Sequence, residues 1–88
     1  MSTQKQEETL VLKGRAYQLE KLARSRHKTF WEETDLNELL FGLRMEMYEL
    51  REAADSRENI EEVWRQAANV ANFAMMVAAR YETLWRAE

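Results

Sequence analysis

The sequence predicts an all-α protein, and three observations lead to this prediction. The 88 residues include no proline and only two glycines, so the positive-φ turns that connect β-strands would be hard to build. Strong helix formers such as Ala, Glu, Leu, Arg and Met dominate the composition. Apolar residues also recur at helical spacing over long stretches. We expect one domain over residues 1–88, with residues 1–6 disordered, as a three-helix protomer of an oligomeric helical bundle.

The first two helices follow from apolar spacing and one capping signal. The first is expected over about residues 7–25, where apolar residues recur at steps of four, three and four (Leu12, Ala16, Leu19 and Ala23). Residues 26–34 then form a connection. Asp35, followed by Glu38, resembles a capping box and predicts the start of the second helix. Its apolar stripe begins at Leu36 and predicts an end near residue 54 or 55.

The third helix is expected from about Ile60, capped by Ser56 or Asp55, to about Trp85. Its middle, residues 67–79, contains only two polar residues, Asn69 and Asn72. A helix that is apolar on nearly all sides is buried on nearly all sides. Two neighbouring helices cannot bury it so completely, and we therefore expect a homodimer or a homotetramer.

Composition and charge exclude several classes of protein. Without cysteine and with one histidine, neither a disulfide framework, a thiolate metal site nor a Ser-His-Asp triad is expected. No apolar run reaches the roughly 18 residues of a membrane span, and the N-terminus is no signal peptide, so we expect a cytoplasmic protein. Residues 13–28 carry six basic residues and one acid. Because no aromatic pattern typical of a nucleic-acid platform interleaves them, we interpret them as a solvated helix face rather than a nucleic-acid surface.

The strongest functional signal is a carboxylate pair that should face an amide pair. Glu46 and Glu49 share one side of the second helix, while Gln66 and Asn69 interrupt the apolar third helix. If the two helices pack antiparallel, both pairs lie at similar distances from the turn. Buried amides need hydrogen-bond partners or a ligand, and oxygen ligands suit Mg²⁺. Taken alone, however, Glu46 and Glu49 would be read as a solvated surface pair.

Two stretches resemble the MazG-like branch of the all-α nucleoside triphosphate pyrophosphohydrolases, many of whose small members are phage-encoded. Residues 43–54 (LRMEMYELREAA) look like the first Glu-x-x-Glu motif of that family, and residues 66–78 (QAANVANFAMMVA) look like the second motif. The resemblance covers roughly residues 28–80. It implies hydrolysis of a nucleoside triphosphate to the monophosphate and pyrophosphate, with Mg²⁺ as cofactor.

The second motif departs from the family pattern. Where the family has Glu and Asp, this chain has Gln66 and Asn69, and both changes remove a charge. Mg²⁺ should therefore bind weakly, because cation affinity falls with the number of charged ligands. Two interpretations stay open: an attenuated or non-catalytic natural member, or a site neutralised by deliberate substitution.

The resemblance also implies roles for individual residues. Glu46 and Glu49 would be the catalytic carboxylates and metal ligands, with Gln66 and Asn69 at the remaining ligand positions and Glu62 as a further ligand. The residues expected to bind the nucleotide are Asn72, Lys28, Trp31 and Arg44. Asn72 has a second interpretation, as a hydrogen-bonded core residue. The alternative function is a non-catalytic, oligomeric helical bundle that serves as an interaction protein.

Overall fold

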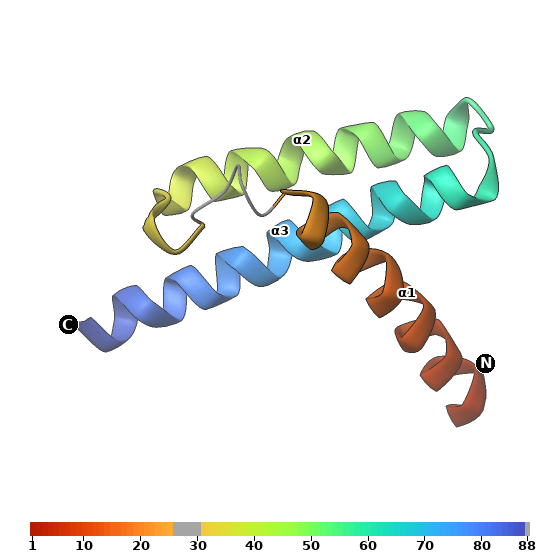
Figure 1. Cartoon of the computed structure of the whole chain (residues 1–88), viewed down its shortest axis with the longest axis horizontal. Helices are drawn as coiled ribbons and strands as arrows, with labels where there is room; N and C mark the ends of the chain where they lie inside the picture. The colour runs from red at the N-terminus through yellow and green to blue at the C-terminus, as the bar shows by residue number, and fades with distance from the viewer. Residues whose placement is uncertain (26–30, 88) are drawn as a thin grey trace.

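The computed structural model describes residues 1–25 and 31–87, and every regular element within them is helical. Its elements are α1 (Gln4–Ser25), the short 3-10 helix η1 (Trp31–Glu33), α2 (Leu36–Asp55) and α3 (Ile60–Ala87). Helices α2 and α3 form an antiparallel hairpin, and α1 crosses α3 (Figure 1). The all-α prediction is confirmed, although α1 begins three residues before the expected start.

The two long helices of the hairpin begin at side-chain caps. Asp35 caps α2 as predicted, because its carboxylate accepts a hydrogen bond from the backbone N of Asn37 at 2.9 Å. The prediction for α3 is wrong, since the cap is not residue 55 or 56. Instead, Oδ1 of Asn59 accepts from the backbone N of Glu62 at 2.8 Å, and residues 55–56 close the end of α2.

The α2–α3 turn is a Schellman-type helix end. Ser56 is the C-cap, and Arg57 after it has φ = 53°, in the left-handed region. The backbone N of Glu58 donates to the carbonyl of Ala53 at 3.0 Å, and that of Arg57 donates to the carbonyl of Ala54 at 3.2 Å. These two bonds satisfy carbonyls that the helix leaves free at its end. The chain thus reverses within a few residues and sets α3 antiparallel to α2.

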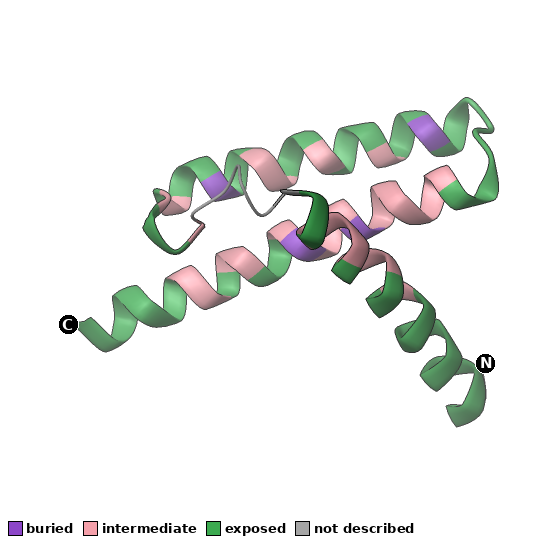
Figure 2. Ribbon diagram, viewed as in Figure 1, coloured by how far each residue is buried: buried purple, intermediate pink, exposed green. Residues whose placement is uncertain are grey.

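Few side chains of the described residues are fully buried. Leu39 and Ala53 of α2 and Ala68 of α3 form the apolar core, and Asn72 is the one buried polar residue among those described (Figure 2). Leu39 is 2% exposed and Asn72 is 7% exposed. Many large apolar side chains on all three helices remain exposed. The fold therefore has a thin core and wide apolar surfaces.

Helix α1 docks on α3 through its second half only. The ring of Tyr17 stacks on that of Trp64 at a centroid distance of 5.9 Å. The ammonium of Lys13 lies over the Trp64 ring, 4.7 Å from its centroid, in a cation–π contact. Residues 4–12 of α1 are exposed and project away from the hairpin (Figure 1).

A side-chain hydrogen bond links the segment before α2 to α3. The guanidinium Nε of Arg80 donates a hydrogen bond to the backbone carbonyl of Thr34 at 3.0 Å. This hydrogen bond connects residues 46 positions apart in the sequence, and it holds the start of α2 beside the second half of α3.

Candidate functional site

Helices α2 and α3 pair in one antiparallel register that decides which side chains meet. Each step forward along α2 is matched by an equal step back along α3. The pairs in this register are Gly42 with Phe73, Glu46 with Asn69, and Glu49 with Gln66. The expected meeting of the carboxylate pair and the amide pair is therefore what the structure has. We call these four polar residues (Glu46, Glu49, Gln66 and Asn69) the α2–α3 seam.

Glu46 lies at the centre of the α2–α3 seam. Its pKa is raised above its ordinary value of 4.5, first by burial and then by the charge of the neighbouring Glu49 carboxyl and a side-chain hydrogen bond to it. A hydrogen bond from the Asn69 amide and the positive charge of Lys21 act in the opposite direction. Two carboxyl groups are thus held together in a place where a positive charge is favoured.

Two buried oxygen atoms of the α2–α3 seam have no hydrogen-bond partner among the described residues. They are Oε2 of Glu46 and Oε1 of Gln66, and they come from facing helices. The amide nitrogen of Gln66 is engaged, because it donates to Oε1 of Glu62 at 3.1 Å. A buried acceptor without a donor costs about 1–3 kcal/mol. Each of these oxygens therefore favours a donor or a cation as ligand.

An acidic cavity of about 460 Å³ opens beside the seam, toward the α2–α3 turn. Four carboxylate side chains line it and no basic one does; its lining residues are Glu49, Glu52, Ala53, Ser56, Glu58, Asn59, Glu62 and Gln66. Glu49, Glu62 and Gln66 are expected here from the sequence, whereas Glu52, Glu58 and Asn59 are not, because their place in the cavity depends on how the turn brings the two helix ends together. The cavity would repel a free anion and attract cations.

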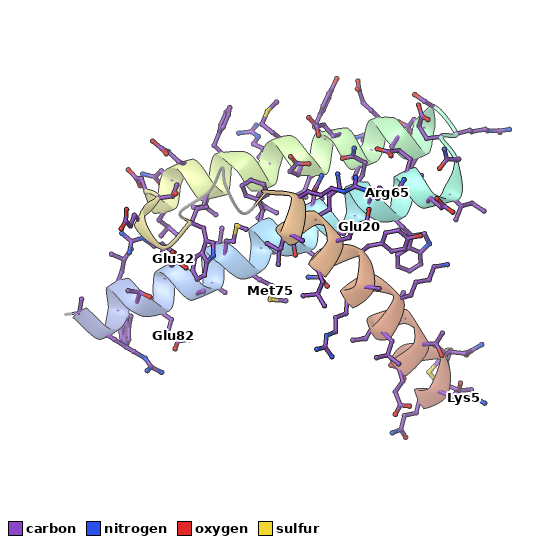
Figure 3. The ribbon with its side chains drawn as sticks, in the orientation of Figure 1. Lys5, Glu20, Glu32, Arg65, Met75 and Glu82 are labelled. Atoms are coloured by element: carbon purple, nitrogen blue, oxygen red, sulfur yellow. The ribbon has the colours of Figure 1, made fainter. Side chains whose placement is uncertain are left out.

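Glu62 is shared between the cavity and an ion-pair cluster. Oε2 of Glu62 lies 3.8 Å from Arg65, whose Nε is 3.4 Å from Oε1 of Glu20 on α1. Glu20 and Arg65 point toward each other between α1 and α3 (Figure 3). Arg65 also pairs with the more exposed Glu61 at 3.5 Å. This cluster holds α1 against the side of α3 that carries the seam.

Asn72 does not join the α2–α3 seam. Its amide donates to the backbone carbonyl of Gln18 at 3.1 Å, and its Oδ1 accepts from Nε2 of Gln18 at 3.2 Å. Asn72 therefore faces α1 and is satisfied within the core, which is the second of the two interpretations that the sequence leaves open. Gln66 and Asn69 of α3 therefore face α2, whereas Asn72 faces α1.

The residues expected to bind a nucleotide are only partly brought together. Trp31 and Asn72 line one mostly apolar pocket of about 300 Å³ between α1, η1 and α3. Arg44 is exposed on α2, and Lys28 lies outside the described residues. The cation that the structure places beside the seam is Lys21 of α1. The sequence gives no signal for Lys21, because its position depends on how α1 crosses α3.

The donor set of the seam fits a hard cation in chemical type. Every candidate ligand is an oxygen, which Mg²⁺ prefers, and two of these oxygens are buried without a partner. The seam holds only two carboxylates, and no group of three or more His, Cys, Asp or Glu side chains in the described ranges could hold a metal ion. A cation here would depend on amide oxygens or on oxygens that a ligand brings.

Comparison with known proteins adds no family to these observations. Searches against family models, curated proteins and solved structures return no match for this chain. None of the helices in the described ranges is long and apolar enough to cross a membrane. A function must therefore be argued from the residues and their geometry.

Proposed function

We propose that the α2–α3 seam binds a nucleoside triphosphate together with Mg²⁺ and promotes its hydrolysis to the monophosphate and pyrophosphate. The observation that carries the proposal is the pair of buried oxygens without a donor, on Glu46 and Gln66. A cation held between two helices would satisfy both atoms. The resemblance of residues 43–54 and 66–78 to the MazG-like pyrophosphohydrolases supplies the substrate class. On this proposal the protein acts in the cytoplasm, as a homodimer or homotetramer.

The cation is required for electrostatic reasons. Four carboxylates line the cavity beside the seam, so a triphosphate alone would be repelled. Glu46 and Glu49 would hold Mg²⁺, helped by the carbonyl oxygens of Gln66 and Asn69 and by Glu62. When bound, the ion would neutralise charge on the phosphate oxygens. Because two of the four seam residues are neutral, binding would be weak and would depend on the phosphates as further ligands.

The chain itself supplies orientation and a base. Glu49 is exposed at the mouth of the cavity, where its carboxylate would accept a proton from the attacking water. The water oxygen forms a bond to the α-phosphorus as the bond to the bridging oxygen breaks, and pyrophosphate leaves. Lys21, beside Glu46, is the described cation best placed to meet a phosphate oxygen.

The second candidate is a non-catalytic helical bundle that serves as an interaction protein. One observation favours it: the Asn69 amide already hydrogen-bonds to Glu46, as a polar pair that fixes the register of two helices would. On this reading the two neutral residues of α3 are structural, and no phosphate chemistry follows.

The test compares the parent with the Gln66→Glu/Asn69→Asp variant for Mg²⁺-dependent pyrophosphate release. The panel contains ribo- and deoxyribonucleoside triphosphates. We expect the double variant to be at least tenfold faster, because it restores two carboxylate ligands. Adding Glu49→Gln to that variant should abolish release, whereas adding Glu7→Gln, at the exposed start of α1, should not change it.

Thermal shift with Mg²⁺ and a non-hydrolysable triphosphate separates binding from hydrolysis. A shift that requires both Mg²⁺ and nucleotide supports the proposed binding site even if the parent is slow. No release and no shift in either protein would refute the proposal and leave the interaction protein as the better account.

A further inference from the structure

One face of α3 carries an unbroken row of apolar residues that α1 and α2 leave mostly exposed. The row runs from Ile60 through Trp64, Tyr81 and Trp85, with alanines at positions 67, 71, 74 and 78 between them. Its steps alternate between four and three residues, which is the heptad spacing of helices that pack side by side. We call this row the α3 stripe. Ile60 is 74% exposed and Trp85 is 66% exposed.

The position of the α3 stripe follows from the two faces of α3 that are already occupied. Ala68 and Asn72 face α1, while Phe73 faces Gly42 of α2. At about 100° per residue, the centre of the stripe lies roughly 110° from the face that contacts α1 and about 130° from Phe73. Trp64 is partly covered by Tyr17 and Lys13 of α1, and Ala67 and Ala71 are half-buried, while the other five members of the stripe are exposed. The stripe and the α2–α3 seam lie on opposite sides of α3.

The exposed area of the chain is larger than that of a typical compact monomer of its mass. The accessible surface is 7290 Å² for a mass of 10.5 kDa, whereas a compact monomer of this mass exposes roughly 5,400 Å². The excess of about 1,900 Å² is more than twice the ~800 Å² that each partner buries in a standard interface. Even if part of this excess belongs to the projecting first half of α1, the remaining area is enough for an interface with another protein chain.

We propose that a second copy of this chain covers the α3 stripe, with the two α3 helices antiparallel and the two-fold axis between Asn72 and Phe73. In this register Ile60 lies opposite the partner's Trp85, and Trp64 lies opposite the partner's Tyr81. The four alanines of each chain meet in the middle, where small side chains let the two backbones approach closely.

Charge selects the antiparallel arrangement over the parallel one. Residues 57–62 carry three Glu and one Arg, while residues 80–86 carry two Arg and one Glu. An antiparallel pair places each acidic end beside a basic end, whereas a parallel pair would place two acidic ends together. The antiparallel helix dipoles are also favourable.

The first experiment is sedimentation equilibrium of the full chain across a range of concentrations. We expect a dimer for the parent, and at least about 100-fold weaker association for Ala74→Glu, which places two charges near the two-fold axis. Ala74 is exposed in the protomer, so the variant should keep its helical circular dichroism. Thr83→Glu, on the opposite side of α3, is the matched control and should associate as the parent does.

A second measurement tests direction and register, using the absence of cysteine from the chain. An equimolar mixture of Ala67→Cys and Ala78→Cys chains should oxidise to a disulfide heterodimer. Neither variant alone should cross-link, because like positions lie about 16 Å apart along the antiparallel pair, beyond disulfide reach. A monomeric parent, an Ala74→Glu variant that still dimerises, or efficient cross-linking of Ala67→Cys with itself would each overturn the proposal.

Discussion

Replacing each glycine by alanine should change stability in opposite directions, although both glycines lie within helices. At Gly42 a new Cβ would lie 2.9 Å from both Cδ1 and Cζ of the Phe73 ring, and closer still to Cε1. At Gly14 the nearest atom to a new Cβ would be Cζ3 of Trp64 at 4.0 Å, which is ordinary van der Waals contact. The difference in stability between the two variants therefore measures how tightly α2 packs on α3 at Gly42.

The magnitudes follow from two opposing effects. Alanine is favoured over glycine in a helix by about 1 kcal/mol, so Gly14→Ala should raise the free energy of unfolding by up to that amount. Gly42→Ala has the same gain, but pushing a ring out of a packed interface costs about 1–3 kcal/mol. We expect Gly42→Ala to be less stable than the parent by about 1 kcal/mol, a difference of about 2 kcal/mol between the variants.

The assay is urea unfolding followed by circular dichroism at one fixed chain concentration, since association would add to stability. A Phe73→Leu background should remove most of the penalty of Gly42→Ala, which a double-mutant cycle measures directly. If Gly42→Ala is stabilised as much as Gly14→Ala, the α2–α3 register is incorrect. The α2–α3 seam would then be incorrect too, because Glu46 and Asn69 meet in that same register.

Three further variants test other parts of the structure. Glu46→Gln should stabilise the fold at pH 7, because the folded-state pKa of Glu46 is raised above 4.5. The parent should lose stability relative to the variant as the pH rises from about 4.5 through that raised pKa. Urea titrations at several pH values would measure this loss. Asn72→Ala should cost about 1–3 kcal/mol by leaving the Gln18 side chain and carbonyl without their partner, and an unchanged urea midpoint would contradict this contact. Arg57→Gly should be neutral or stabilising by up to about 1 kcal/mol, because φ = 53° strains a side chain but not glycine; a clear loss in thermal unfolding would speak against that turn geometry.

The features that could be predicted from the sequence are those set by local spacing. The start of α2 directly after Asp35, its end at residue 55 and the length of α3 follow from caps and apolar patterns within a few turns. The meeting of Glu46 with Asn69 also follows, because a short turn fixes the register of two antiparallel helices. This much of the candidate site is a property of the hairpin alone.

What could not be predicted depends on contacts between distant segments. The crossing of α1 over α3 decides that Asn72 faces Gln18 and that Lys21 approaches Glu46. Neither contact leaves a periodic signal in the sequence. The cap of α3 at Asn59 could not be predicted for another reason. Residues 55–58 form the Schellman-type end of α2, so the first residue left to cap α3 is Asn59 rather than Asp55 or Ser56.

The position of Lys21 has a consequence for how the protomer would respond when a divalent ion binds at Glu46. The ammonium of Lys21 is near enough to lower the pKa of Glu46, and it belongs to a helix that is anchored by its second half only. A divalent ion placed on Glu46 would compete with that ammonium for the same carboxylate, so each would weaken the hold of the other. Binding of the ion at Glu46 and detachment of α1 from α3 are therefore thermodynamically linked. Backbone amides of residues 4–25 would exchange with deuterium faster when the ion is bound.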